Sequence, residues 1–436
     1  MRYADKKSYE LYNQGKWNEL IAYSENAISK KIDFIFLRVR LGVAYYETGK
    51  YFDAIINLKR AFDQGYENPF VIENLYYSYL QAGRPNDAEF YFYKLPNEIR
   101  EKIRPLDNSF MTELNADAGT GISNDKSSNS GVDLDGADNV YGEQILYDNY
   151  FFLNAGFKQK PLRWLSISYS YNYLSLKKTK EIMYNDSRIS DDYTQQQQQF
   201  YNEYEIRAGD GFVISPSGHY IFTKDNTVYA NYDSLSVRQT KGNDSVLYYY
   251  TVTKRESIQD NFVLSLNLSK QFYNYKAAVH GSFSYLNGAH QTQFGASLTA
   301  YPLKKNTFYT FSDLLVHTQN SDHQVIFFQS AGGKLYKELW GEVFATFGRI
   351  NNYNEQNGAL VFNNPDVIKF KLGAEFNYYF NKNLSASLVY VYQKREKNYL
   401  IYKVYAFNNL IPLSRPEFVK LDYSVNTILA GLKLYF

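Results

Sequence analysis

The sequence predicts a multidomain α + β chain, in which an N-terminal α-solenoid of three helix pairs precedes an antiparallel transmembrane β-barrel of about 14 strands. Three observations lead to this fold class. The chain ends in an alternating apolar strand that finishes at Phe436. It contains 45 Tyr and 31 Phe in 436 residues, although its mean hydropathy is only −0.48. A spacing of 34 residues, from Gly15 to Gly49 and from Gly49 to Gly83 (49 − 15 = 34, 83 − 49 = 34), recurs near the N-terminus.

The helical part is predicted from this 34-residue period. Each of the three glycines is followed by a basic residue, and the second repeat, from Ile35 to Asn68, has the clearest pattern. The same register aligns small and apolar residues, namely Leu20 with Ala54 and Ala88, and Ala27 with Ala61 and Leu95. These positions resemble the packing positions of tetratricopeptide repeats. The resemblance covers about a quarter of the chain and implies a superhelix of helix pairs.

A partner-binding groove is expected on the first helix of each pair, because these helices line the concave face of such a superhelix. The groove residues that we expect are Phe36, Val39, Val43, Tyr46, Glu47, Glu73, Tyr77, Leu80 and Gln81. Two alternatives remain open at this stage. Several of these aromatics could simply pack the stack, or the same surface could dock onto the periplasmic rim of the barrel.

The barrel is predicted from the alternation of apolar and polar residues after Ser109. No run approaches the roughly 18 apolar residues that a transmembrane helix needs. The last strand places one apolar face toward lipid, and it resembles the closing strand that the assembly machinery of bacterial outer-membrane barrels recognises. The residues of this expected C-terminal signal are Ile428, Leu432, Leu434 and Phe436.

The alternating runs give 14 expected strands, an even number as single-chain barrels require. They lie near 109–121, 145–158, 163–177, 195–208, 212–222, 257–272, 275–287, 290–301, 306–318, 322–335, 339–350, 366–380, 384–397 and 421–436. The run 212–222 contains Pro216, so a kink, a plug segment or a loop is an alternative there. Short connections are expected in the periplasm, and long exterior loops are expected at 122–144, 178–194, 223–256, 351–365 and 398–420.

The interior of the barrel is expected to be polar and to carry both signs of charge. The expected lumen residues are Glu113, Asp117, Glu203, Glu205, Arg207, Lys369, Lys371 and Glu375. Because both signs are present, no strong ion selectivity follows. Inward side chains or the 223–256 loop could close the pore.

Several classes of chemistry are not supported by the sequence. The absence of Cys excludes disulfides and thiolate zinc sites. The five His form no catalytic or metal-ligating pattern, and no phosphate-binding glycine loop is found, so we expect no catalytic residues, no metal, no cofactor and no enzyme activity. Lys and Arg are scattered among acidic residues, which argues against nucleic-acid binding.

The expected organisation is a periplasmic helical domain over 1–104 and an outer-membrane barrel over 105–436 of a Gram-negative bacterium. Residues 1–30 show no apolar signal segment, so we expect that a signal peptide has been removed. The architecture resembles surface lipoprotein assembly modifiers and repeat-bearing exopolysaccharide-export barrels, and the composition is similar to that of Bacteroidetes-type barrels. This resemblance implies a non-enzymatic export or assembly component that contacts outer-membrane lipid and periplasmic or outer-membrane protein partners. A porin-like solute channel and a structural subunit of a larger complex are the alternatives.

Overall fold

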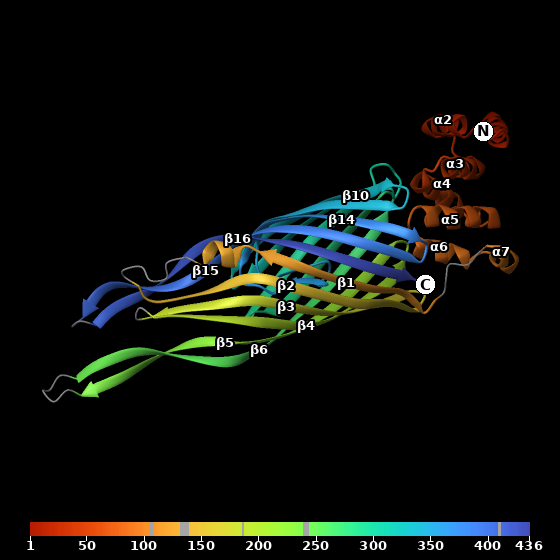
Figure 1. Cartoon of the computed structure of the whole chain (residues 1–436). Helices are drawn as coiled ribbons and strands as arrows, with labels where there is room; N and C mark the ends of the chain where they lie inside the picture. Colours follow the sequence, from red (N-terminus) through yellow and green to blue (C-terminus); the bar gives the residue numbers. More distant parts are fainter. Residues whose placement is uncertain (104–108, 131–138, 185–186, 239–243, 409–410) are drawn as a thin grey trace.

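The computed structural model describes residues 1–103, 109–130, 139–184, 187–238, 244–408 and 411–436. Helices occupy the N-terminal part and lie at one end of a long barrel (Figure 1). The expected domain boundary at 104/105 lies outside the described residues. Among the described residues, no helix is long and apolar enough to cross a membrane.

The N-terminal part consists of paired helices with a regular spacing. They are α1 (Arg2–Asn13), α2 (Trp17–Ser29), α3 (Ile35–Glu47), α4 (Tyr51–Asp63), α5 (Pro69–Gln81), α6 (Pro85–Phe92) and the short α7 (Asn97–Lys102). The starts of α2, α4 and α6 are 34 residues apart (51 − 17 = 34, 85 − 51 = 34). Each pair turns at a glycine with positive φ, at Gly15 (64°), Gly49 (72°) and Gly83 (72°), which is the conformation that favours glycine after a helix.

Close packing of α3 against α4 depends on Gly42. A Cβ atom at this position would lie 2.6 Å from Cγ of Leu58, which is fully buried. We therefore expect Gly42→Ala to lower the free energy of unfolding of the helical part by about 1–3 kcal/mol through overpacking, although alanine is the better helix former. The loss of helical circular dichroism on heating would measure this effect in the full chain.

A matched control for this variant is Ser78→Ala on α5. The buried Oγ of Ser78 has no hydrogen-bond partner among the described residues, so its removal should not lower stability. Unfolding of Gly42→Ala at the wild-type temperature would contradict the packing argument.

The barrel is a closed antiparallel sheet of 14 strands, which confirms the predicted barrel. The strands are β1 (Met111–Ser123), β2 (Asn139–Leu162), β3 (Leu165–Tyr184), β4 (Ser187–Gly209), β5 (Phe212–Arg238), β6 (Asp244–Phe272), β7 (Tyr275–Leu286), β8 (Ala289–Ala300), β9 (Phe308–Gln319), β10 (Asp322–Tyr336), β11 (Leu339–Ile350), β14 (Val367–Asn381), β15 (Leu384–Asn408) and β16 (Ile411–Tyr435). Strand β16 closes the barrel by pairing with both β1 and β15. Two short strands, β12 (Tyr353–Glu355) and β13 (Leu360–Phe362), form a separate sheet.

The region around Pro216 is part of a strand, so the alternatives of a loop or plug at 212–222 are wrong. Pro216 lies opposite Leu266 on β6. On the β4 side, the ladder has pairs at Glu203–Ser217 and at Ile206–Ile214 but none at Pro216 itself, where the backbone donor is missing.

Much of the expected exterior loops at 178–194, 223–256 and 398–420 is strand instead. Hairpins β3–β4, β5–β6 and β15–β16 continue beyond the rest of the barrel and project at the end away from the helices (Figure 1). The extension of the β3–β4 hairpin has the largely polar sequences KKTKEIMY (177–184) and SRISDDYT (187–194), which lack the apolar alternation that marks a membrane-facing strand.

The outer surface of the barrel is apolar near the helical end. The expected C-terminal signal residues lie on this outer face, with exposed fractions of 49% for Ile428, 55% for Leu432 and 46% for both Leu434 and Phe436. The alternate residues Val425 and Thr427 are buried inside. This alternation gives an apolar exterior around a polar interior.

Candidate functional site: a polar cavity beneath a lumen insert

Residues 351–366, which connect β11 to β14, fold back into the barrel; we call them the lumen insert. Its contacts reach different parts of the wall. The side chain of Gln293 on β8 donates to the carbonyl of Asn354 at 2.9 Å, and the amide of Asn357 donates to Glu203 on β4 at 2.8 Å. The expectation of an exterior loop at 351–365 is therefore wrong, and it is this segment, rather than 223–256, that occupies the lumen.

The tip of the lumen insert is a tight turn that suits its sequence. Gln356, Asn357 and Gly358 all have positive φ, at 52°, 56° and 82°. Asn and Gly adopt this conformation at low cost. The carbonyl of Gly358 lies 2.7 Å from Nδ1 of His219 on β5, which fixes the tip against the wall.

The base of the lumen insert is held by a small apolar cluster and a buried ion pair. Tyr353 is 2% exposed and packs in a cluster that includes Leu315 and Ile326 of the wall. Lys371 on β14 lies 2.5 Å from Glu355, and both side chains are less than a tenth exposed. The lumen insert is thus bound to β4, β5, β8 and β14 together.

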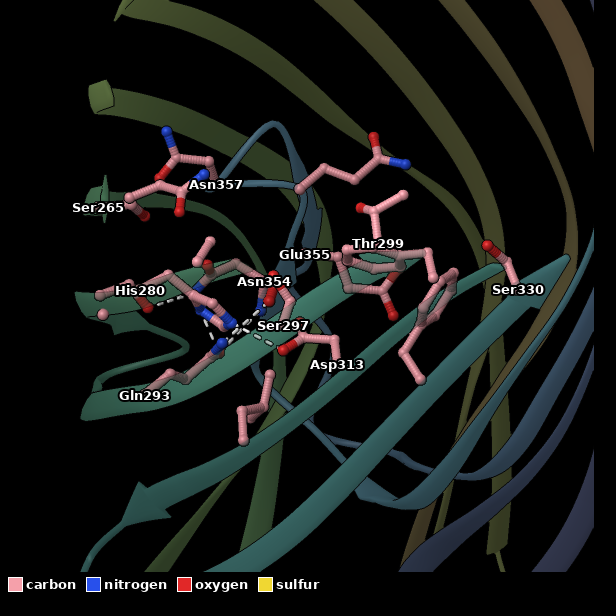
Figure 2. A pocket seen from close by; sticks show the side chains of 18 of the residues that line it. Ser265, His280, Gln293, Ser297, Thr299, Asp313, Ser330, Asn354, Glu355 and Asn357 are labelled. Atoms are coloured by element: carbon pink, nitrogen blue, oxygen red, sulfur yellow. Dashed lines mark hydrogen bonds and ion pairs between the residues drawn. The ribbon is translucent and has the colours of Figure 1, made fainter. Parts of the chain in front are cut away.

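A cavity of about 440 Å³ lies between the lumen insert and the wall formed mainly by β6–β11 (Figure 2). Its lining combines hydroxyl and amide groups with a few aromatic rings, four carboxylates (Glu203, Asp313, Glu342 and Glu355) and one lysine, Lys276. The polar side chains labelled there include Ser265, Gln293, Ser297, Thr299, Ser330, Asn354 and Asn357, and the rings include Tyr309, Phe311, Phe328 and Tyr353.

A histidine–aspartate pair lies in this cavity, with Nε2 of His280 2.8 Å from Oδ1 of Asp313 (Figure 2). The two residues are on β7 and β9, with β8 between them. Gly295 lies opposite His280 on β8, and a Cβ atom there would come within 2.7 Å of the imidazole ring. Because Gly295 has no side chain, the imidazole ring of His280 can extend across β8 to Asp313. Sequence inspection missed this pair because the two residues are distant in the chain, and only the register of both hairpins would have indicated it.

Several polar atoms around the cavity are buried and have no hydrogen-bond partner among the described residues. They are Oγ of Ser265, Oδ1 of Asn267, Oγ of Ser330, Oε1 of Glu355 and Oδ1 of Asn357. A buried polar atom without a partner costs free energy unless water or a ligand satisfies it. The carboxylate of Glu342, by contrast, accepts from the hydroxyl of Tyr309 at 2.5 Å.

Most of the expected lumen residues lie on the inner face of the barrel. Lys158 and Arg207 both contact Glu205, at 3.0 and 3.1 Å. Lys371 binds the lumen insert, as described above. Glu113, Asp117, Glu203 and Glu375 also lie on inward positions.

Lys369 is an exception, and its expected place in the lumen is wrong. A β-bulge between Ile368 and Phe370 shifts the alternation, so that Lys369 lies on the outer wall. There its ammonium group contacts Asp422 at 2.8 Å and Glu396 at 3.0 Å.

The expected groove residues fall into two groups. Val39 and Val43 are 7% and 5% exposed and belong to the core of the helical part, so they are not available to a partner. Their apolar side chains fill the space between neighbouring helices. The others are at least partly accessible: Phe36, Tyr46, Glu47, Glu73, Tyr77, Leu80 and Gln81.

The helical part contacts the barrel rim mainly through second helices and their preceding turns. Asp53 on α4 accepts from the hydroxyl of Tyr273 in the β6–β7 turn at 2.8 Å. Glu89 on α6 contacts Lys160 at the end of β2 at 2.5 Å. Asp87 accepts from the backbone N–H of Gly211 in the β4–β5 turn at 3.1 Å. The ring of Phe52 packs against the ring of Tyr301, which lies in the connection between β8 and β9. The rim is therefore bound by a surface other than the expected groove.

Charged groups at the junction between the helical part and the barrel stabilise one another's ionised forms. The hydrogen bond from Lys304 to Tyr273, together with the nearby Asp53, holds the pKa of Lys304 above its ordinary value. Partial burial raises the pKa of Asp210, but the hydrogen bond from Lys270 and the charge of Lys59 outweigh it, so the pKa lies below its ordinary value. Both shifts favour the charged forms across the junction.

A second inward segment lies farther from the helices. The short helix α8 (Asp125–Asn129) contacts β2 and β16, and the fully buried Asp125 pairs with Lys397 on β15 at 2.8 Å. Asp125 also accepts from the backbone N–H of Tyr147 at 2.8 Å and from Asn129 at 2.7 Å. Beyond the end of β1, β15 pairs directly with β2.

His317 and His323 lie in different surroundings. His317, which is 1% exposed, lies beside the ring of Tyr353, whereas His323 lies near Thr318. Within the described ranges, no group of three or more metal-ligating residues is present.

No family model matches this sequence, and no curated protein is significantly similar to it. Among solved structures, a FadL homologue of Pseudomonas aeruginosa aligns with 7% identity and a TM-score of 0.44, covering 74% of this chain and 90% of that one. The toluene transporter TodX of P. putida aligns with 7% identity and a TM-score of 0.45, covering 74% and 90%. A MamA mutant aligns with 26% identity and a TM-score of 0.21, covering 24% and 56%. At these scores the likeness carries no information about substrate.

Proposed function

We propose that this protein is a non-enzymatic channel of a bacterial outer membrane, and that small polar solutes bind in the cavity beneath the lumen insert. The observation that carries this proposal is a cavity of about 440 Å³ inside a closed barrel, lined by hydroxyl, amide and carboxylate side chains. A cavity of this size is in the range that holds a small molecule. Its hydroxyl and amide groups with nearby rings suit a hydroxyl-rich solute, and its four carboxylates against one lysine disfavour an anionic one.

In this proposal, the position of the barrel in the membrane follows from its apolar outer face and its polar interior. The apolar outer face of β16 and its neighbours contacts lipid, and the polar interior remains wet. The helical part is a periplasmic tetratricopeptide-type domain, because short turns face the periplasm in such barrels and the helices contact those turns.

Passage of a polymer or folded client is a weaker candidate. The lumen insert is attached to β4, β5, β8 and β14, so its displacement would break several contacts at once. A small solute needs no such displacement.

Solute uptake into proteoliposomes tests the proposed function directly. Vesicles containing the full chain should swell in small neutral sugars faster than vesicles without protein, and should exclude large dextrans. Swelling equal to that of empty vesicles for every small solute would refute the channel.

A second candidate function, partner binding by the helical part, is favoured by one observation. Rim contacts use α4 and α6, whereas Phe36 on α3 remains 50% exposed and Tyr46 and Tyr77 are partly accessible. In this candidate the chain serves as an assembly or export component, or as a subunit of a larger complex.

Affinity purification from native outer membranes, followed by mass spectrometry, distinguishes this candidate. A partner that is captured by the wild type should be lost from Tyr46→Glu/Tyr77→Glu, while Tyr3→Glu on α1 serves as a control for an exposed aromatic outside the expected groove. If both variants capture the partner equally, the expected groove is not the partner-binding surface.

A further inference from the structure

A charged cluster lies on the outer wall of the barrel, toward the end away from the helices. We call it the outer-wall cluster. It spans four strands and consists of Arg349 on β11, Lys369 on β14, Lys394 and Glu396 on β15, and Lys420 and Asp422 on β16. Four basic and two acidic residues give a net charge of 4 − 2 = +2 in one small area.

The cluster is ordered by its two carboxylates. Glu396, with a side chain 9% exposed, contacts Lys369 at 3.0 Å, Arg349 at 3.1 Å and Lys420 at 3.2 Å. Asp422 contacts Lys369 at 2.8 Å and Lys394 at 3.5 Å. The acids thus hold four cationic groups together without neutralising them.

The most exposed cations are at the edges of the cluster. The side chains of Arg349 and Lys420 are 52% and 62% exposed, so both retain donors that can bind an anion from outside. Guanidinium and ammonium groups arranged in this way are typical of phosphate recognition.

The position of the cluster indicates which phosphate would reach it. Directly beneath it, the outward residues of β11 form an apolar run of nine positions, which is close to the length that spans a bilayer: Leu339, Gly341, Val343, Ala345 and Phe347. Phe347 and Tyr392 lie two residues below Arg349 and Lys394 on their strands. Aromatic residues at this level are expected at the boundary between acyl chains and headgroups.

We propose that the outer-wall cluster binds the phosphate groups of a phosphorylated glycolipid of the outer leaflet, with its acyl chains on the apolar wall below. This inference rests on the proposed membrane seating but not on the channel activity. The ligand is the lipid itself, because only a molecule with both phosphates and acyl chains contacts the cluster and the apolar run together.

Native mass spectrometry of the full chain in detergent tests this assignment. The probes are diphosphorylated lipid A, lipid A without its phosphates, and inorganic phosphate. We expect the wild type to retain the diphosphorylated form preferentially, and Arg349→Gln/Lys420→Gln to bind it at least about tenfold more weakly. Lys369 remains in this variant to pair with Glu396.

Lys224→Gln is the matched control, because Lys224 is an outer-wall lysine 47% exposed that pairs only with Glu256 in the contacts of the described residues. It should bind lipid like the wild type, and Arg349→Lys/Lys420→Arg should retain binding. Equal retention of lipid A with and without phosphates, unchanged binding by the double Gln variant, or displacement of the lipid by an equal concentration of inorganic phosphate would each overturn the proposal.

Folding and channel activity are followed separately. Heat-dependent migration on gels reports whether each variant forms the barrel, and Lys420→Gln alone replaces the double variant if the latter does not fold. Solute swelling should remain at the wild-type rate in the double variant, so a failure of lipid binding is distinguishable from a failure of the channel.

Discussion

Shortening the lumen insert should raise the single-channel conductance several-fold. The backbone N–H of Asn352 donates to the carbonyl of Asn364 at 3.2 Å, so a short Gly-Ser turn can join these two positions without moving β11 or β14. Shortening the lumen insert deletes groups that cross the lumen, including Asn357 and Glu355, and widens the lumen at that level. Recordings in planar bilayers would measure the change.

The control is a variant trimmed at the β5–β6 hairpin instead. Ala230 and Val252 are paired on neighbouring strands, so a turn can be built between them. This removes most of the segment 223–256 that sequence reasoning assigned to pore closure. We expect this trimmed variant to have the wild-type conductance. A higher conductance of the trimmed variant, together with an unchanged conductance after shortening of the lumen insert, would show that the β5–β6 hairpin and not the insert restricts the pore.

Replacement of Lys397 by Met should destabilise the barrel by about 3–5 kcal/mol, because it leaves a buried carboxylate without its cation. Asp125 is fully buried, and the Lys397 side chain is only 2% exposed. The temperature at which the folded band is lost on gels, supported by denaturant titration, would measure this effect.

Two further variants isolate the ion pair as the cause. Asp125→Asn/Lys397→Met removes both charges and should recover much of the loss. Lys433→Met removes an exposed cation that lies 3.9 Å from Glu113, and it should change the stability by less than about 1 kcal/mol. A Lys397→Met protein as stable as the wild type would contradict the electrostatic argument.

The short strands were predictable from sequence because one face of each contacts an apolar environment. Strands β7 to β11 lie within two residues of their expected bounds. The outer halves of β5 and β6 were missed, since their polar residues show no alternation of the kind that lipid imposes. The 34-residue spacing of α2, α4 and α6 matches the spacing of Gly15, Gly49 and Gly83 in the sequence, from which the repeat was predicted.

The candidate site was less accessible to sequence reasoning, because it depends on long-range register. The polar residues of the lumen insert look like an exterior loop, and its apolar contacts with the wall come from a few residues, Tyr353, Val361 and Phe362. A single bulge moved Lys369 from the expected lumen to the outer wall. The His280–Asp313 pair required the register of two hairpins and the absence of a side chain at Gly295.

The unequal strand lengths have a consequence for contact with the exterior. Strand β5 has 27 residues and β7 has 12, a difference of 27 − 12 = 15 residues, which corresponds to roughly 50 Å along the strand. In the proposed orientation, the β5–β6 ribbon is therefore among the first parts that an antibody or a neighbouring cell would touch. The turn between β7 and β8 lies far below it, so such contacts would be made by the ribbon and not by this turn.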